Sequence, residues 1–229
     1  MMPTSLKSRL MVQGAFAFFV LVALLFVPAG TLDFWEAWVF LAIFFIPMII
    51  FSIYYYQHDR ALVERRMQNR EKVTEQKWIM RFAFLFFLLG LLVPGLDHRF
   101  GWTRRWIGGV PLWVEIAAQA LTLTGYLGTM WVIDVNRFAA RTVQVERDQR
   151  VISSGPYGVV RHPMYSFALV MWLATATALG SYVALPFFAL LIPVIVLRLL
   201  NEEKVLRREL PGYAEYYERT RYRLAPYIW

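Results

Sequence analysis

Long apolar stretches alternate with short polar segments along most of this chain. About 20 mostly apolar residues are enough for a helix to cross the hydrocarbon core of a bilayer. Six stretches approach or meet that length, and they cover residues 11–30, 34–56, 78–96, 112–133, 164–180 and 182–200. The pattern therefore predicts an all-α fold, a polytopic membrane helical bundle of about six spans.

The last two stretches have almost no connector between them, which predicts a tight helical hairpin with a short first arm. Pro186 and Pro193 lie in the second arm, and Pro47 lies in the second stretch. We expect a bend at each of them, because proline has no N–H for the helical hydrogen bond. A tight hairpin also returns the chain to its starting side, so the residues at its two ends should be neighbours in space.

The polar segment that precedes the hairpin gives a division of the chain into two parts. Residues 1–133 are expected to hold about four N-terminal membrane spans. Residues 134–229 hold a polar loop (134–163), the hairpin and a C-terminal tail, and we expect them to form the functional core on the cytoplasmic side.

Basic residues crowd the polar segments on one side of this bundle. Most of the 24 Lys and Arg residues lie in the N-terminus, residues 57–77, the 134–163 loop and the tail from Arg198. An excess of Lys and Arg marks cytoplasmic loops, so we expect both termini to be cytoplasmic. The compact chain suggests a bacterial inner membrane.

Composition and charge exclude several classes of function. Apolar residues make up 59% of the chain, above the roughly 45–50% of soluble domains. The net charge of +8 is explained by the basic loops, so we expect contact with membrane lipid head groups and no nucleic acid. The chain has no Cys and three scattered His, so disulfides, a cysteine nucleophile and a metal site are not expected.

Polar residues that can do chemistry gather in the last third of the chain. Three short stretches stand out at the two ends of the hairpin, namely Ser-Gly-Pro-Tyr at 154–157, Arg-His-Pro-Met-Tyr at 161–165 and Glu-Glu at 202–203. Each stretch alone has an ordinary explanation, as a turn, an interfacial anchor or a solvated helix face. Their convergence at one membrane depth favours a functional site, because ionisable groups there are rarely incidental.

The combination of these three stretches resembles the isoprenylcysteine carboxyl methyltransferase family with its bacterial relatives. A looser version is shared with the phospholipid N-methyltransferases. The resemblance covers about residues 134–229 and includes further similar positions at Asn136-Arg137-Phe138, Val151-Ile152, Gly212-Tyr213, Tyr216-Tyr217 and 219–223.

This resemblance implies that S-adenosylmethionine binds in a cytoplasm-facing pocket covered by the 134–163 loop and the tail. The residues expected to bind it are Gly155, Tyr157, His162, Pro163, Tyr165 and Glu202. Arg161 and Glu203 are expected to be catalytic. Arg161 would position an acceptor carboxylate, whereas Glu203 or His162 would be the base for an amine or thiol acceptor.

The implied acceptor is a lipophilic or lipidated molecule, with the carboxylate of an isoprenylcysteine-like substrate as the first expectation. Two other functions compete with methyl transfer. Membrane sterol reductases also carry a His-Pro-x-Tyr element, matched here by residues 162–165, but they bind NADPH. A non-enzymatic lipid-binding or transport protein is the third alternative.

Overall fold

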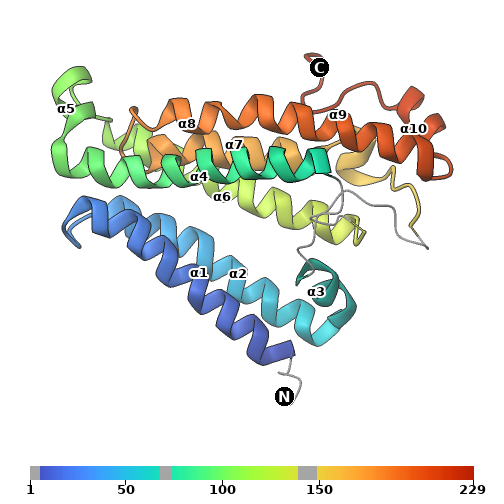
Figure 1. Ribbon diagram of the computed structural model, residues 1–229, viewed down its shortest axis with the longest axis horizontal. Coiled ribbons are helices and arrows are strands. Elements are labelled where there is room, and N and C mark those ends of the chain that lie inside the picture. The colour runs from blue at the N-terminus through green and yellow to red at the C-terminus, as the bar shows by residue number, and fades with distance from the viewer. Residues whose placement is uncertain (1–5, 68–73, 139–148) are drawn as a thin grey trace.

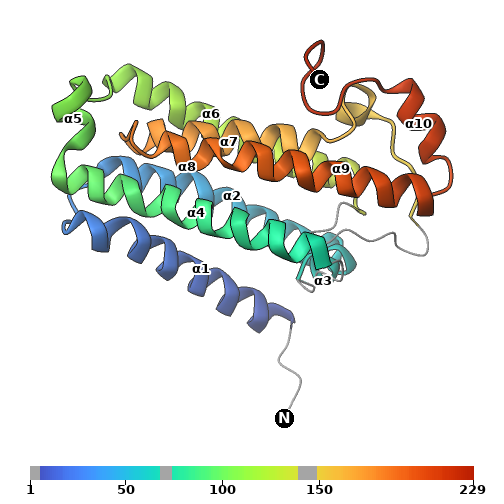
Figure 2. The same ribbon diagram turned by 45° about the horizontal axis from the view of Figure 1, so that its top comes forward.

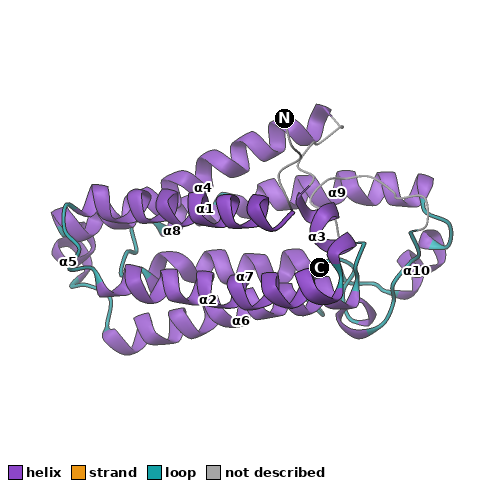
Figure 3. Ribbon diagram, turned by 90° about the horizontal axis from the view of Figure 1, so that it is seen from below, coloured by secondary structure: helices purple, strands orange, loops and turns teal. Residues whose placement is uncertain are grey.

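The computed structural model describes residues 6–67, 74–138 and 149–229, and within these ranges the chain is helical without strands (Figures 1 and 3). The long helices are α1 (Leu6–Ala29), α2 (Trp35–His58), α4 (Thr74–Phe100), α6 (Leu112–Val135), α7 (Pro163–Ala178) and α9 (Leu191–Glu209). Shorter elements are α3 (Arg60–Met67), α5 (Trp102–Ile107), the 3-10 turn η1 (Gly155–Gly158), α8 (Leu185–Ala189) and α10 (Tyr213–Arg219).

Among the described residues, five segments of this bundle are long and apolar enough to cross a membrane. They are α1, α2, residues 77–100 of α4, α6, and the continuous pair α8 and α9. The sixth expected stretch is α7, whose 16 residues span only about 24 Å at 1.5 Å per residue, less than a hydrocarbon core of about 30 Å. The predicted polytopic helical bundle is confirmed, with five full-length segments and one short one.

The last apolar stretch is divided into α8 and α9 at Leu190. Pro193 lies in the first turn of α9, and it has no N–H to donate to the carbonyl of Ala189, the last residue of α8. This missing hydrogen bond gives a physical reason for the interruption. In contrast, α2 continues as one helix through Pro47.

Two glycines on α6 let α7 approach very closely. A Cβ built on Gly125 would lie 2.7 Å from both the carbonyl oxygen of Phe167 and the backbone nitrogen of Met171, and one on Gly128 would overlap the Phe167 ring. Small residues allow such close contact between membrane helices. The main neighbour of α7 is therefore α6, which lies across the proposed division at residue 134, and that division remains a prediction.

A buried hydrogen-bond network fixes the turn between α7 and α8. Asp97 near the end of α4 accepts hydrogen bonds from the backbone and hydroxyl of Thr103 on α5 and, at 2.5 Å, from the Ser181 hydroxyl. The Tyr182 backbone N–H also donates to the Thr103 hydroxyl at 3.1 Å. All these groups lie at the end of the bundle marked by α5 in Figure 2. The network holds α7 in place along its axis.

At the opposite end of the bundle α7 begins and α9 ends, next to α10 (Figure 1). The start of α7 and the end of α9 are thus brought together, as the hairpin predicts. The orientation of this end toward the cytoplasm remains a prediction.

The close contact between α6 and α7 yields a stability prediction. We expect Gly125→Leu to lower the free energy of unfolding by about 1–3 kcal/mol, because backbone atoms of α7 have to move to admit the side chain. Thermal unfolding in detergent measures the loss. Ala120→Leu, on the exposed face of the same helix, is the matched control and should leave the transition unchanged. An equal loss in both variants would contradict the packing role of Gly125.

Candidate active site

The C-terminal tail folds back onto the segment that leads into α7. Val160 and Tyr222 form an isolated parallel bridge, in which the Arg161 backbone N–H donates to the Tyr222 carbonyl at 2.8 Å and the His162 N–H donates to the Arg223 carbonyl at 2.9 Å. The Ser166 hydroxyl on α7 donates to the Leu224 carbonyl at 2.6 Å. The backbone of the tail is thus joined to the start of α7.

The Glu203 carboxylate near the end of α9 lies at the centre of this junction. Its Oε1 accepts a 2.7 Å hydrogen bond from Arg161 Nε and lies 3.3 Å from His162 Nε2, and its Oε2 accepts a 3.0 Å bond from Arg223 Nε. Its side chain is only 6% exposed. Two guanidinium groups around one buried carboxylate keep that carboxylate ionised.

Arg161 extends the junction into the tail. Its Nη1 donates to the carbonyls of Thr220 at 2.6 Å and Arg221 at 2.9 Å. Its guanidinium carbon lies 4.1 Å from the centre of the Tyr217 ring, a cation–π contact. Arg161 therefore has polar or aromatic partners from α9, α10 and the tail.

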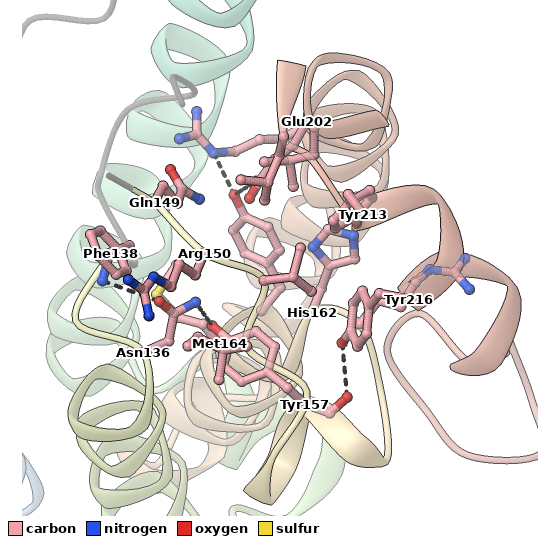
Figure 4. A pocket seen from close by; sticks show the side chains of 17 residues that line it. Asn136, Phe138, Gln149, Arg150, Tyr157, His162, Met164, Glu202, Tyr213 and Tyr216 are labelled. Carbon is pink, nitrogen blue, oxygen red and sulfur yellow. Dashed lines mark hydrogen bonds between the residues drawn. The ribbon is translucent and has the colours of Figure 1, made fainter. Parts of the chain in front are cut away.

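A pocket lies beside this junction, between the start of α7, the end of α9 and α10 (Figure 4). It is lined by Asn136, Phe138, Gln149, Arg150, Val151, Ile152, Tyr157, Arg161, His162, Met164, Tyr165, Arg198, Glu202, Leu206, Leu210, Tyr213 and Tyr216. On one wall the Tyr165 hydroxyl donates to Glu202 Oε2 at 2.7 Å and accepts a 2.9 Å bond from Arg198 Nε. A carboxylate, a phenol and a guanidinium thus share one wall.

Three further phenols face the pocket. The Tyr157 hydroxyl accepts a 3.0 Å hydrogen bond from Asn136 Nδ2, and the Tyr216 hydroxyl donates to the Tyr157 carbonyl at 2.8 Å. The Tyr213 hydroxyl is buried and has no hydrogen-bond partner among the described residues. One polar group in the pocket wall is therefore left for a ligand or a water molecule to satisfy.

Burial keeps these phenols neutral. It raises the pKa of Tyr157 and Tyr213 above their usual value, and for Tyr213 the negative charges of Glu203 and Glu202 add to the effect. Burial also raises the pKa of Tyr216 to about 12. At physiological pH the three side chains therefore offer neutral hydroxyls and aromatic faces.

The structure brings together five of the eight residues expected at the site, and Arg161, Tyr157, His162, Tyr165 and Glu202 all line the pocket. Among the described residues, Gly155, Pro163 and Glu203 lie outside its lining. Gly155 adopts a left-handed conformation with φ +57° at the start of η1, Pro163 is the first residue of α7, and Glu203 lies in the junction. Their catalytic or binding roles remain predictions.

Several lining residues were not assigned to the site from sequence, among them Arg198, Leu206, Tyr213 and Tyr216. Helical spacing offered one signal, because Arg198 and Leu206 lie four residues before and after Glu202 and so share its helix face. Tyr213 and Tyr216 lie in the part of the C-terminal tail that resembles the isoprenylcysteine carboxyl methyltransferase family, but nothing in their spacing indicated that they line a pocket. Residues 139–148 of the loop expected to cover the site lie outside the described residues.

Comparison with known proteins supports a membrane methyltransferase. Residues 113–211 match the family model described as phospholipid methyltransferase, a stretch that includes both ends of the predicted hairpin. The description is broader than the isoprenylcysteine-specific resemblance, which remains a prediction. The match begins near the start of α6, ahead of residue 134.

Three curated proteins are similar to parts of the chain. The Delta(14)-sterol reductase TM7SF2 of Mus musculus is 31% identical over 91 residues, which are 38% of this chain and 22% of the reductase. The nickel-cobalt-cadmium resistance protein NccN of Alcaligenes xylosoxydans xylosoxydans is 27% identical over 124 residues, 52% of each chain. The cobalt-zinc-cadmium resistance protein CzcN of Cupriavidus metallidurans is 29% identical over 139 residues, 58% of this chain and 56% of that protein. The chain therefore spans about a fifth of the reductase and about half of each resistance protein.

The arrangement around Glu203 yields the second prediction. We expect Glu203→Gln to lower the free energy of unfolding by about 3–5 kcal/mol, because two guanidinium groups lose their shared counter-charge, one of them fully buried. Thermal unfolding and limited proteolysis of the C-terminal tail measure the effect. Glu218→Gln, on the exposed surface of α10, should change stability by less than about 0.5 kcal/mol. A tail that is equally resistant to protease in both variants would show that Glu203 does not hold it.

Proposed function

We propose that this chain transfers a methyl group from S-adenosylmethionine to a lipophilic acceptor, with the carboxylate of an isoprenylcysteine-like substrate as the acceptor group. The observation that carries the proposal is the pocket between α7, α9 and α10. It combines a carboxylate, guanidinium groups and neutral phenols, and most of its lining falls within the segment that matches the phospholipid methyltransferase model.

The pocket residues suit the chemistry of S-adenosylmethionine. Its ammonium and sulfonium groups match the Glu202 carboxylate and the ring faces of Tyr157 and Tyr165. Its carboxylate matches a guanidinium such as that of Arg198. Its ribose hydroxyls offer partners to the buried Tyr213 hydroxyl, which has none among the described residues. The apolar lining residues suit a purine ring.

The volume of the pocket sets a condition on binding. It is about 90 Å³, well below the roughly 300–1,000 Å³ of typical ligand sites. A ligand of nucleoside size therefore needs wall side chains to move. The bond between Tyr165 and Glu202 has to open or turn if Glu202 is to contact a ligand cation.

When bound, S-adenosylmethionine supplies a methyl group on an activated leaving group, so the protein mainly has to align the reactants and exclude water. Both Glu203 oxygens are already engaged by Arg161, His162 and Arg223. We therefore assign to Glu203 the role of a positioning residue for Arg161 and His162. A carboxylate acceptor fits this assignment because it needs no general base.

A reductase that binds NADPH is the second candidate, and the similarity to a Delta(14)-sterol reductase favours it. The Glu202 carboxylate argues against it, because a negative group on the pocket wall repels the pyrophosphate of a dinucleotide. Direct binding separates the two functions.

We expect purified protein in detergent to bind S-adenosylhomocysteine saturably in isothermal titration and to show no binding of NADPH. Glu202→Gln should weaken S-adenosylhomocysteine binding about 10- to 100-fold, because a charged hydrogen-bond partner contributes about 1.5–3 kcal/mol. Glu209→Gln, at the exposed end of the same helix, should bind as the unmodified protein does. Binding of NADPH alone would establish the reductase instead, and binding of neither ligand would remove both enzymatic proposals.

The acceptor class gives a separate prediction. With S-adenosylmethionine labelled in its methyl group, we expect label to enter a prenylated cysteine derivative and to be released as methanol by alkali, since only a methyl ester is cleaved in this way. The rate should be flat from about pH 6.5 to about pH 9, because a carboxylate with a pKa near 4 is ionised throughout. Alkali-stable label in phosphatidylethanolamine would overturn the carboxylate acceptor and leave methyl transfer intact.

A further inference from the structure

Three oxygen-bearing side chains meet at the end of the bundle opposite the pocket. Glu36 lies in the first turn of α2, Glu115 lies in the first turn of α6, and Gln119 follows Glu115 by one turn on the same helix face. Figures 1 and 2 show the starts of α2 and α6 near the end of α7. The three side chains therefore come from two helices, α2 and α6, and are distant from the junction around Glu203.

Gly180 shows that the two carboxylates face a common space. This residue follows α7 with φ +68°, a conformation that favours glycine. A Cβ built on it would lie 3.3 Å from Glu115 Oε1 and 3.5 Å from Glu36 Oε1. The two oxygens therefore flank a single point that the absence of a side chain leaves open.

Buried acceptors in this cluster have no donor among the described residues. Glu36 Oε2 and Gln119 Oε1 are both buried without a hydrogen-bond partner, and Glu115 and Gln119 are only 8% and 5% exposed. No described Lys, Arg or His forms an ion pair with either carboxylate. A buried acceptor without a partner destabilises the folded protein. The first turn of a helix favours a negative charge, but it supplies no donor to these oxygens.

The hydrogen bonds of Gln119 fix the direction of its amide. Its Nε2 donates to the Glu36 carbonyl at 3.1 Å and to the Ala178 carbonyl at 2.7 Å. The nitrogen thus donates to two backbone oxygens, and Oε1 has no hydrogen-bond donor among the described residues. The two accepting carbonyls belong to Glu36 itself and to Ala178, two residues before Gly180, so the amide lies between the start of α2 and the end of α7, beside the two carboxylates.

We propose that Glu36, Glu115 and Gln119 form a binding site for a hard divalent cation of the calcium class. Two carboxylates balance a charge of +2, and carboxylate and amide oxygens are the ligands that such ions take, with water completing the shell. The half-buried Glu36 gives access from the aqueous side of this end.

The absence of Cys and the scattering of the three His exclude thiolate and imidazole metal sites. The site proposed here uses carboxylate and amide oxygens instead. The described residues contain no group of three or more His, Cys, Asp and Glu side chains suited to a metal, and here the third ligand is an amide. The proposal is independent of methyl transfer, because the pocket lies at the other end of the bundle.

Thermal unfolding of the full chain in detergent, after removal of metals with a chelator, tests the site. We expect calcium chloride to raise the melting temperature saturably, by about 5 °C when the ion is at 100 times its Kd. Glu36→Gln and Glu115→Gln should abolish the rise. Glu215→Gln, an exposed acid in the first turn of α10, is the matched control and should keep it.

Terbium provides a direct measurement on the unmodified chain, in case a buried substitution prevents folding. We expect tryptophan-sensitised terbium emission, helped by the neighbouring Trp35, that calcium displaces and that the half-buried substitution Glu36→Gln removes. The proposal is overturned if the unmodified protein shows neither signal, or if Glu36→Gln and Glu115→Gln respond as the control does. Stabilisation by mild acid with no response to calcium would also overturn it, because the two carboxylates would then share a proton.

Discussion

One buried carboxylate, that of Glu203, joins three parts of the chain that are far apart in sequence. Burial of a charge is tolerated only when it is paired and hydrogen-bonded. Arg161 and Arg223 supply that pairing, and Arg161 also holds the carbonyls of Thr220 and Arg221. The end of α9, the start of α7 and the tail are therefore mutually dependent. The pocket is formed between these segments, so its shape depends on the same interaction.

The bundle supplies the fixed positions that this junction needs. Close contact at Gly125 places α7 against α6, and the hydrogen bonds of Asp97 with Thr103 and Ser181 fix the far end of α7. With α7 held along its length, His162 at its start has one position relative to α9. A membrane helix of only 16 residues gains its order from these contacts more than from its own length.

Neighbouring carboxylates on α9 have separate environments. Successive residues of a helix point about 100° apart, so Glu203 faces the guanidinium groups while Glu202 faces the pocket and the Tyr165 hydroxyl. A carboxylate with both oxygens engaged suits a supporting role, and one on the pocket wall suits contact with a ligand cation. The division of labour in the proposed methyltransferase follows from this difference in direction.

The sequence by itself determined the helical bundle and the meeting of residues 161–165 with residues 202–203, because apolar length and a short connector leave the chain few alternatives. It also indicated Tyr157, Tyr165 and Glu202 as neighbours. Only the tertiary structure decided which way each side chain points. The place of Tyr213 in the pocket, and the meeting of Glu36 with Glu115 and Gln119, depend on how each helix is rotated about its axis. That rotation is set by contacts between helices, such as those of Gly125 and Gly128 on α6 with α7. These contacts join residues that are far apart in the sequence, and the periodicity of each helix alone does not predict them.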